Sequence, residues 1–554
     1  MKFSKVVFVC TLMFVVAQSS AQKVGKPNIL FLAIDDLKPI LGCYGDKLIK
    51  TPNIDRLAKM GTVFLNNQCQ QAVCGPTRAS LMTGMRPDVT KIWDLKTKMR
   101  DVNPDILTLP QYLISQGYTT SGIGKIYHPS SIDKKNDVLS WSIPYLTAQP
   151  SDYANNLGAP AYKNYQSEAM KQRLADESNK DVDAEKGSNT DKSEKGGKKG
   201  KKEKKEDDGE NVEGSRGPAT ENLDLPDNAY EDGVNAILAK EQIIKLSAAK
   251  EPFFMAVGFH KPHLPFVAPR KYWNMYNREE MPLASFQQHA ANEVFIAYES
   301  SGELRNYSDI PEFTTYTKAD LRAGLKPEKQ KELINGYYAS ISYVDAQVGI
   351  LLNTLDSLGT LKNTIIVLWG DHGWHLGDHD MWGKHTNFEQ ATRSPLIVVG
   401  PGLKAGKSSS PTEHVDIFPT ICNLAGLSIP SQLEGKSLKP IMLDNKAKVK
   451  AFAMSQYPRK MKKDDIEKFG FANGKLMGYS LRDNRYRYTM WMNDFNSKQP
   501  FDVKKVFAIE LYDYVKDPLE TINVANEKSY ATVAKDLNEE MVKFLKAQES
   551  TTAK

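Results

Sequence analysis

The chain has 554 residues, of which 40% are hydrophobic, and its mean hydropathy is −0.48. That is enough apolar material for a large buried core, and the length predicts two or more domains. The formal net charge of +6 falls to about +4 without residues 1–21, which carry two lysines and no acid. Such a weak bias gives no reason to expect a nucleic-acid partner.

The first residues indicate an export signal. A basic start with Lys2 and Lys5 precedes an apolar run over residues 6–17, and small residues then offer a cleavage point after Ala21. The apolar run is too short to span a bilayer, and no later segment is a credible membrane span. We therefore expect a mature protein that begins near residue 22 and is periplasmic or secreted.

Cysteine is sparse in the chain that would remain after cleavage. The four cysteines are Cys43, Cys69, Cys74 and Cys422. For an exported protein of this length, disulfides are then not the main source of stability, although a Cys69–Cys74 disulfide stays an alternative. No second cysteine pair or nearby histidine cluster completes a zinc site. We interpret Cys43, Cys69 and Cys422 as structural thiols.

Short apolar runs alternate with helical patterns along most of the chain. The runs cover residues 29–34, 253–257, 365–369 and 396–399, with a weaker one at 118–124. They predict buried parallel strands. The helical patterns cover residues 51–61, 108–117 and 327–358. This alternation predicts an α/β fold, with a parallel sheet that helices cover on both faces.

Two segments depart from this pattern. Residues 185–216 are rich in Lys, Glu and Gly and have no apolar period, so they predict a disordered surface insertion. Residues 195–205 are locally basic and leave a nucleic-acid or polyanion contact as an alternative to a solvated loop. Beyond about residue 440, a hairpin pattern at 479–493, a strand at 508–518 and an amphipathic helix at 529–548 follow. They predict a smaller antiparallel C-terminal subdomain over 441–554, after a main domain over 22–440.

Polar side chains follow four of the predicted strands. They are Asp35 and Asp36, then Lys125 and His128, then His260, Lys261 and His263, and finally Asp371 and His372. Each group alone is typical of a turn or a solvated loop. Because the carboxyl ends of parallel strands meet at one edge, the three carboxylates together predict a hard-cation site. The nearby lysines and histidines favour an anionic substrate, and hydrolysis of a phosphate or sulfate ester fits these groups.

A nucleophile is supplied by a motif elsewhere. Residues 74–79, Cys-Gly-Pro-Thr-Arg-Ala, continue as Ser-Leu-Met-Thr-Gly-Met-Arg-Pro, and they resemble the Cys-x-Pro-Ser/Thr-Arg signature of type I sulfatases. Residues 28–46, 122–129, 258–266 and 370–398 most resemble the iduronate-2-sulfatase subgroup. The resemblance implies an alkaline-phosphatase-like fold with a mixed, mostly parallel sheet and a smaller C-terminal antiparallel sheet with a terminal helix.

The resemblance also implies a metal centre. Asp35, Asp36, Asp371 and His372 would hold one calcium ion, together with a Cα-formylglycine that a maturating enzyme makes from Cys74. Most sulfatases have Asn where His372 stands, whereas the iduronate-2-sulfatase group has His. A nitrogen ligand is unusual for calcium, so the presence of a metal is better supported than its identity.

The remaining roles are carried over residue by residue. Arg78 and Lys125 would orient the formylglycine and its sulfate, and His128 would hydrogen-bond a hydroxyl of the hydrated aldehyde. His260 and Lys384 would hold the sulfate, with His260 as the proton donor to the leaving alcohol. One hydroxyl of the gem-diol attacks sulfur, and the second allows the sulfate to be expelled, an exit that a plain serine or cysteine lacks.

Other residues near the motifs receive weaker assignments. Trp374 and His375 directly follow the metal ligands and are the best candidates for further substrate contacts. The remaining histidines are interpreted mostly as ordinary side chains; they are His263, His289, His379, His385 and His414.

The resemblance implies hydrolysis of sulfate esters on a sulfated polysaccharide or oligosaccharide, at the 2-O-position of a uronic acid or related sugar. The expected partners are this glycan and the maturating enzyme, with no nucleic acid. One alternative is a phosphonate monoester or phosphodiester hydrolase with the same cysteine signature. The other is a non-catalytic polyanion-binding protein that uses the insertion at 185–216. Glycan identity and exo or endo action stay open.

Overall fold

The computed structural model describes residues 25–154, 157–161, 164–176, 217–311, 324–461 and 463–552. The predicted export signal at 1–21 and the predicted insertion at 185–216 lie outside these residues. The main sheet has seven strands. In spatial order they are β12 (Gly406–Ser408), β2 (Thr62–Phe64), β11 (Leu396–Val399), β8 (Thr364–Gly370), β1 (Asn28–Ile34), β6 (Phe253–Phe259) and β4 (Thr119–Gly124).

Strand β1 lies between β8 and β6 in the interior of the sheet, and its side chains divide between two cores. Leu30, Leu32 and Ile34 belong to one hydrophobic cluster, and the alternate residues Ile29 and Phe31 belong to another. This is the period-two alternation of a strand that is buried on both faces. Strands β4, β6, β1 and β8 are parallel, as the apolar runs predicted.

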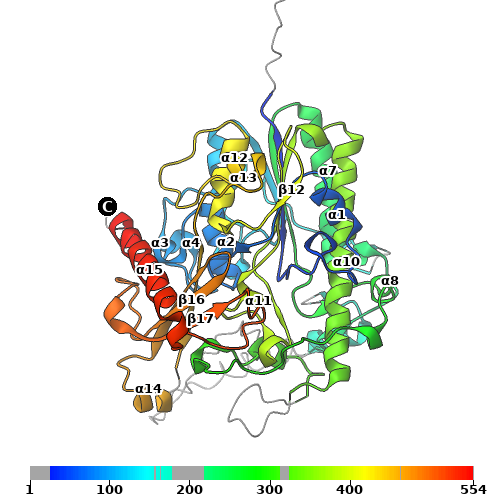
Figure 1. Cartoon of the computed structure of the whole chain (residues 1–554). Coiled ribbons are helices and arrows are strands. Elements are labelled where there is room, and N and C mark those ends of the chain that lie inside the picture. Colours follow the sequence, from blue (N-terminus) through cyan, green and yellow to red (C-terminus); the bar gives the residue numbers. More distant parts are fainter. Residues whose placement is uncertain are drawn as a thin grey trace, which may run out of the picture.

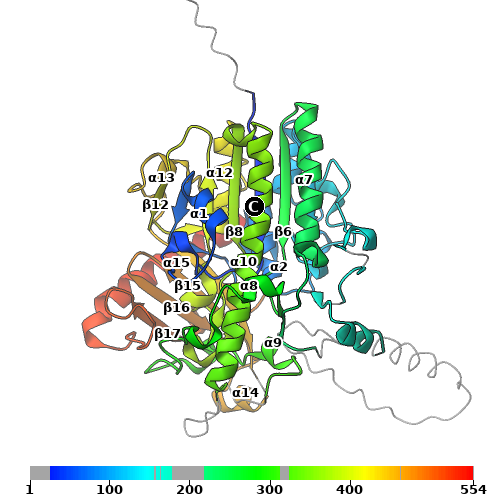
Figure 2. The same cartoon turned by 90° about the vertical axis from the view of Figure 1, so that its right-hand side faces the viewer.

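Helices cover both faces of the sheet, with α1, α7 and α10 on one side and α2, α12 and α13 on the other (Figure 1). Their bounds, with the remaining helices of the α/β part, are α1 Pro52–Ala58, α2 Cys74–Thr83, α3 Pro87–Thr90, α4 Met99–Val102, α5 Leu109–Ser115, α7 Glu231–Ala249, α8 Arg270–Trp273, α9 Gly302–Arg305, α10 Pro327–Ser357, α11 Glu389–Thr392, α12 Ile417–Leu424 and α13 Lys439–Leu443. Figure 2 shows α10 running along the sheet beside β6 and β8. The predicted helices correspond to α1, α5 and α10.

Strand β11 corrects one expectation, because it is antiparallel to both of its neighbours, β8 and β2. From its apolar pattern, the run at 396–399 was expected to form a strand parallel to the others. The chain leaves β8 at the carboxyl edge and enters β11 at that same edge, with Leu396 opposite Trp369. A parallel strand would need a crossover connection along the sheet, whereas the connection here consists of loops, a short hairpin and the four-residue α11.

Three small two-stranded sheets connect loops around the carboxyl edge of the main sheet. They are β3 (Asn67–Gln68) with β13 (Thr412–Glu413), β5 (Thr220–Glu221) with β7 (Phe266–Val267), and β9 (His375–Leu376) with β10 (Trp382–Gly383). The β9–β10 hairpin lies between β8 and β11 in the chain, so it shapes the loop that follows the central strands.

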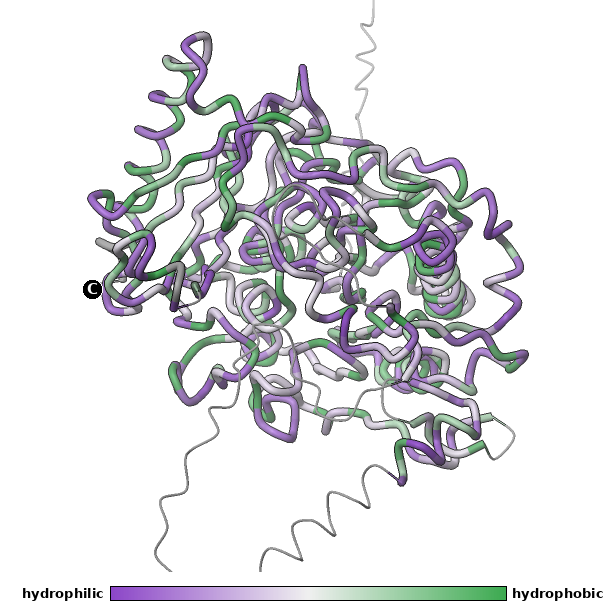
Figure 3. Tube along the Cα trace, turned by 90° about the horizontal axis from the view of Figure 1, so that it is seen from below, coloured by the Kyte–Doolittle hydropathy of each residue, from purple (hydrophilic) through white to green (hydrophobic). Residues whose placement is uncertain are grey.

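The C-terminal part forms the expected antiparallel sheet with a terminal helix. Its strands are β14 (Ala453–Lys460), β15 (Lys475–Arg482), β16 (Tyr486–Met492) and β17 (Val506–Asp513), and its helices are α14 (Lys463–Phe469) and α15 (Ala531–Thr552). The buried Arg487 binds Glu389 of α11 at 2.5 Å, which ties this sheet to the α/β part. Seen from below, hydrophilic segments predominate in the outermost loops (Figure 3). No helix among the described residues is long and apolar enough to cross a membrane.

Candidate active site

The loops after β1 and β8 bring the predicted acidic residues together. These strands pair in parallel with Ile34 opposite Gly370, so Asp35 and Asp36 meet Asp371 at the carboxyl edge. Asp36 has a left-handed backbone with φ of 55°, and its N–H donates to Oδ1 of Asp371 over 2.9 Å. This hydrogen bond fixes the two loops against each other, and all three aspartates are fully buried.

Cys74 begins helix α2, which is buried along its whole length. Its Sγ lies 3.4 Å from Nε2 of His372 and 3.9 Å from Oδ1 of Asp36. Ligand atoms within 4.8 Å of one another come from two overlapping sets, Asp36–Cys74–Asp371–His372 and Asp35–Asp36–Cys74–His263. The five residues that the signature resemblance implied as metal ligands therefore all occur in these sets.

The donor chemistry of this cluster fits a divalent cation. Burial raises the pKa of Asp36, and the nearby Lys384 does not fully offset the effect. A group of buried carboxylates is stable only when cations or hydrogen bonds compensate it. Carboxylate oxygens are the ligands that hard divalent ions prefer, whereas Nε2 of His372 is less typical of calcium. Where residue 74 is matured, a formylglycine oxygen would take the place of Sγ.

Arg78 forms ion pairs with both acidic loops and so holds them together. Its Nε donates to Asp371 and its Nη2 donates to Asp35, both over 2.9 Å, and the whole side chain is buried. Although burial opposes the charge, these carboxylates raise the pKa of Arg78. Burial likewise works against the charged form of Asp35, but Lys125 and Arg78 hold the pKa of Asp35 well below its usual value. The guanidinium also donates to the backbone carbonyl of Lys125.

Two lysines reach residue 74 from different loops. Nζ of Lys125 lies 2.6 Å from Asp35 and 3.9 Å from Sγ of Cys74. Nζ of Lys384 lies 2.9 Å from Oδ1 of Asp36 and 3.8 Å from the same Sγ. Both side chains are almost fully buried, so an anionic group attached to residue 74 would meet two cations in a site of low dielectric.

The position of Lys125 depends on a pair of glycines. Gly124 has φ of 76°, and a Cβ there would lie 2.0 Å from the carbonyl oxygen of Gly258. A Cβ on Gly258 would in turn lie 2.2 Å from the carbonyl oxygen of Lys125. The ends of β4 and β6 can approach this closely only without side chains at both positions.

The two histidines that are candidate catalytic residues, His128 and His260, lie in the loops after β4 and β6. His128 is buried, and its Nδ1 accepts from the N–H of Ser130 over 3.3 Å at the start of a 3₁₀ turn. That turn packs on the signature, since a Cβ on Gly75 would lie 2.7 Å from Oγ of Ser131. The His260 side chain is 30% exposed, which makes it the most accessible of the predicted catalytic residues.

The two predicted substrate contacts differ in their surroundings. Trp374 is buried, and Nζ of Lys384 lies 5.2 Å from its ring centroid. In His375, Nε2 is bonded to Thr386 over 2.9 Å and Nδ1 to the carbonyl oxygen of Asp378 over 3.2 Å. Burial lowers the pKa of His375 to about 3. Since both ring nitrogens are engaged within the loop, the geometry gives no support to substrate binding by His375.

Two further residues lie beside the cluster. His263 was expected at this edge of the sheet without a specific role, and its Nε2 lies 3.9 Å from Oδ2 of Asp36. Glu303 had no assignment, and its carboxylate lies 3.3 Å from His263 and 3.4 Å from Lys384. The histidine follows β6 in a motif that already contained His260, which was a usable signal. Glu303 begins no strand and ends none, so nothing in its local pattern singled it out.

The cysteines agree with the structural interpretation. Among the described residues all four are buried and free, so the alternative Cys69–Cys74 disulfide is not formed. Burial raises the pKa of Cys43 to about 12, and it also raises the pKa of Cys69. Burial, reinforced by Asp35, raises the pKa of Cys74 well above its usual value. An unmodified Cys74 would therefore be a neutral thiol and a weak nucleophile.

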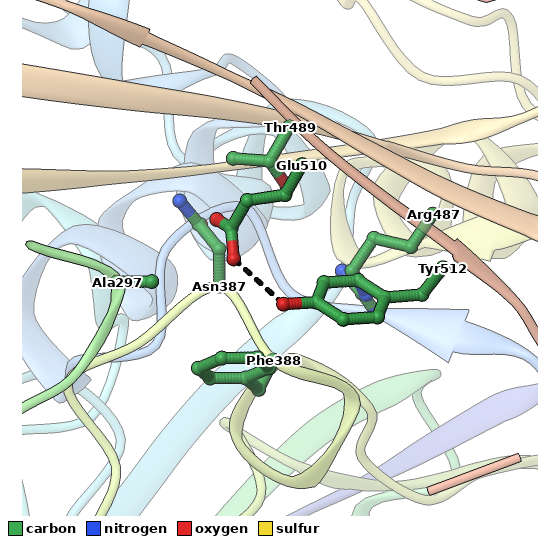
Figure 4. Close-up of a pocket in the computed structure, with 7 residues that line it drawn as sticks. All are labelled: Ala297, Asn387, Phe388, Arg487, Thr489, Glu510 and Tyr512. Carbon is green, nitrogen blue, oxygen red and sulfur yellow. Dashed lines mark hydrogen bonds between the residues drawn. The ribbon is translucent and has the colours of Figure 1, made fainter. Parts of the chain in front are cut away.

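A cavity lies where the C-terminal sheet meets the α/β part (Figure 4). Phe388 lines it from one side, and Arg487, Glu510 and Tyr512 line it from strands β16 and β17. The Tyr512 hydroxyl donates to Oε1 of Glu510 over 2.8 Å. None of the metal-ligand candidates lines this cavity, so it belongs to the contact between the two parts.

Comparisons with known proteins show the family of the chain. Residues 27–427 match the family model described as Sulfatase, and residues 377–547 match N-sulphoglucosamine sulphohydrolase, C-terminal. The chain is 31% identical to an iduronate 2-sulfatase of Mus musculus, with 91% of each chain covered. It is 32% identical to an iduronate 2-sulfatase of Homo sapiens, with 90% of this chain and 91% of that protein covered.

Solved structures share the fold at lower identity. A phosphonate monoester hydrolase of Agrobacterium radiobacter superposes with a TM-score of 0.65 at 23% identity, covering 94% of this chain and 96% of that one. A 2-O GAG sulfatase superposes with a TM-score of 0.59 at 19% identity, covering 95% and 93%. The family model covers most of the chain, and it includes the signature cysteine and the acidic cluster. The chain belongs to the sulfatase family, and its sequence is similar to those of iduronate 2-sulfatases.

Proposed function

We propose that this sulfatase removes the 2-O-sulfate of a uronic acid or a related sugar from a sulfated glycan. The main support for this proposal comes from the surroundings of residue 74. Nζ of Lys125 and Nζ of Lys384 both lie within 3.9 Å of Sγ, beside the buried carboxylates. Such a site suits a sulfuryl group that is transferred to residue 74. The sugar and the position are supported by the similarity to iduronate 2-sulfatases over 91% of the chain.

The proposal includes one divalent cation, with calcium as the first candidate. Its ligands would be Asp35, Asp36, Asp371, His372 and residue 74, which come together in the structure. When bound, a divalent cation at this position lowers the pKa of a coordinated hydroxyl and offsets charge on a sulfuryl oxygen.

The proposal also includes maturation of Cys74 to Cα-formylglycine by a modifying enzyme. The hydrated form of that residue supplies a hydroxyl as the nucleophile toward sulfur. Because burial raises the pKa of the Cys74 thiol, the unmodified side chain would provide little thiolate for the same reaction.

The side chains of this protein then have separate tasks. Lys125 and Lys384 hold the sulfuryl oxygens, since both ammonium groups face residue 74. Arg78 keeps the carboxylates of the two acidic loops in place. His128 takes a proton from a hydroxyl of residue 74, and His260 gives a proton to the departing sugar oxygen.

A screen of defined oligosaccharides tests this function. Wild-type protein and Cys74→Ala are incubated with oligosaccharides that carry a single sulfate, either 2-O on a uronic acid or 6-O on glucosamine. We expect release of 2-O-sulfate by the wild type and none by the variant. Mass spectrometry of the peptide over residues 70–86 measures conversion of Cys74. Preferred release of 6-O-sulfate would refute the proposed position.

Phosphonate monoester or phosphodiester hydrolysis is the second candidate, because such a hydrolase shares the fold at a TM-score of 0.65. Rates on 4-nitrophenyl sulfate and bis-4-nitrophenyl phosphate separate the two, and faster phosphodiester turnover would favour this candidate. A non-catalytic polyanion binder predicts that deletion of residues 185–216 abolishes glycan binding while Cys74→Ala changes nothing. For turnover we expect the opposite: Cys74→Ala abolishes it, and deletion of residues 185–216 leaves it unchanged.

We further propose that residues 1–21 direct export to the periplasm or beyond. Sequencing the N-terminus of the protein from its native host should find a chain that begins near Gln22. A retained Met1 would refute this proposal.

A further inference from the structure

Two carboxylates flank His260 on the side that faces helix α7. Nδ1 of His260 lies 3.7 Å from Oε1 of Glu231 and 3.7 Å from Oδ1 of Asp232. Both acids belong to the first turn of α7, a 19-residue helix that packs along β6. Neither acid belongs to the two sets of metal-ligand candidates, and the roles described above use neither.

Asp232 fixes the backbone that carries the histidine. Its side chain is fully buried and accepts from the N–H of His260 over 2.8 Å and from the N–H of Lys261 over 2.9 Å. The first turn of α7 is itself anchored, because the N–H of Gly233 donates to the Tyr343 hydroxyl over 2.6 Å. The loop after β6 is therefore held to a rigid helix end by one carboxylate.

This anchoring orients the imidazole. With Nδ1 directed at the α7 carboxylates, Nε2 is on the opposite edge of the ring, away from α7. The side chain is 30% exposed, so a substrate atom can reach it. A histidine whose one nitrogen faces carboxylates and whose other nitrogen is accessible has the arrangement of a proton donor that its neighbours hold in place.

The charges around the ring favour its protonated form. The charged groups that face His260 are Glu231 and Asp232 from α7 and Lys125 from the end of β4. Burial works against the imidazolium, and Lys125 does so as well, but the two carboxylates outweigh them and raise the pKa of His260. The effect of Glu231 is Coulombic, so it depends on the charge of the carboxylate and on its distance from the ring.

We propose that Glu231 and Asp232 are positioning residues for His260. They keep its imidazole oriented and protonated, so that it can donate a proton to an alcohol that is a poor leaving group. In the step concerned, the bond between sulfur and the ester oxygen breaks as the sulfuryl group passes to the nucleophile at residue 74. The ester oxygen keeps the electron pair and takes the proton from Nε2, which leaves His260 neutral. The inference deepens the proposed function, since it rests on an alcohol leaving group.

The two acids differ in how they can be tested. Asp232 is buried and holds two backbone N–H groups, so its replacement also disturbs the loop. Glu231 has a side chain that is 39% exposed, and Glu231→Gln removes the charge while the shape is kept. Glu241 is exposed on the same helix, and Glu241→Gln makes the same change of charge away from His260. It is the matched control.

The experiment compares leaving groups of increasing basicity on the matured protein. Wild type, Glu231→Gln and Glu241→Gln are assayed with 4-nitrophenyl sulfate, phenyl sulfate and an alkyl sulfate. A leaving group that is already stable as an anion needs little protonation, so its rate should change less than about 2-fold in Glu231→Gln. The alkyl sulfate should lose about 10-fold or more, because general acid catalysis contributes roughly 10²–10⁴-fold.

The pH profile gives an independent readout. In Glu231→Gln the alkaline limb of kcat/KM should move to lower pH, because the charge that favours imidazolium is gone. A merely structural residue would lower all rates equally and leave the limb in place. Asp232→Asn should show the same leaving-group dependence with a larger loss. In a His260→Gln background, Glu231→Gln should have no further effect on the alkyl sulfate.

Equal losses on all three esters, or an unmoved alkaline limb, would overturn the inference. These esters contain no sugar, so the outcome is independent of the glycan. If no 2-O-sulfated oligosaccharide is cleaved but the leaving-group dependence is found, the proposed substrate is wrong and the role of the α7 carboxylates stands.

Discussion

Thr77 and His414 share a hydrogen bond of 3.1 Å, and Thr77 lies in the first turn of the helix that begins at the candidate nucleophile, Cys74. The same hydroxyl of Thr77 donates to the backbone carbonyl of Asp371 over 3.1 Å, and Nε2 of His414 is bonded to Oγ of Ser394 over 2.9 Å. The signature helix is thereby joined to the end of β8, which carries metal-ligand candidates. Burial lowers the pKa of His414 to about 3, so its ring is neutral and can act as both donor and acceptor.

Replacement of Thr77 by valine should destabilise the protein. The change removes the hydroxyl and leaves a ring nitrogen of His414 and the carbonyl of Asp371 buried without this partner. A buried polar group that loses its partner costs about 1–3 kcal/mol, so we expect the free energy of unfolding to fall by that amount. Thr77→Ser keeps the hydroxyl and should lose less. Urea unfolding of the unmodified chains measures both, and equal stabilities of Thr77→Val and wild type would contradict this account.

Lys384 is predicted to contribute strongly to catalysis. Replacement by methionine removes a cation that lies 3.8 Å from Sγ of Cys74 and should lower kcat/KM by roughly 10²–10³-fold, as loss of a preorganised charge donor does. Lys384→Arg keeps the charge and should retain more activity. Lys362 is exposed, and Lys362→Met is the control that should leave kcat/KM unchanged. A loss below tenfold in Lys384→Met would remove Lys384 from the list of catalytic residues.

Much of this arrangement could be predicted from the sequence, because its signals are local. Apolar runs identified the central strands, and polar residues directly after them identified both acidic loops. The direction of a strand could not be predicted in this way. The run at 396–399 is apolar like the parallel strands, but its direction depends on where the preceding loop returns to the sheet. Apolar content alone carries no information on that path.

The partners of the site residues were harder to predict for the same reason. Glu303 approaches Lys384 through tertiary packing, and His414 reaches Thr77 from a segment more than three hundred residues later. No periodicity relates such pairs. For His375, the place beside two metal-ligand candidates suggests substrate binding, but its hydrogen bonds to Thr386 and Asp378 come from tertiary packing that the sequence pattern does not show.

Binding of a divalent cation should raise the melting temperature. A ligand that binds only the folded state stabilises it, by about 2.7 kcal/mol at one hundred times its Kd. Asp36→Asn removes a buried carboxylate from the cluster and should abolish the shift. Asp378 is a partly buried aspartate that pairs with Lys38 at 2.8 Å and belongs to neither set of metal-ligand candidates, so Asp378→Asn should keep the shift. Thermal unfolding after chelation, with Ca²⁺ or Mg²⁺ added back, measures this effect and compares the two ions. No shift with either ion would contradict a divalent-cation site.

Glu510 makes the contact between the C-terminal sheet and the α/β part sensitive to pH. It is almost fully buried beside the cavity of Figure 4, and it accepts hydrogen bonds from Trp491 over 2.7 Å and from Tyr512 over 2.8 Å. Burial raises the pKa of Glu510 from 4.5 to about 7, and neither hydrogen bond reverses that. The folded protein therefore binds this proton more tightly than the unfolded chain does.

Stability should consequently fall as the pH rises. Below pH 4.5 the carboxyl is protonated in both states, so its contribution is fully present; between pH 4.5 and about 7 only the folded state keeps the proton, and the contribution declines. Above pH 7 the folded state must hold a buried carboxylate. Glu510→Gln is neutral at every pH, so it should be more stable than wild type at pH 8, by about 2 kcal/mol, and close to it at pH 5. Urea unfolding at the two pH values measures the difference, and the same difference at both would show that Glu510 is not the titrating group.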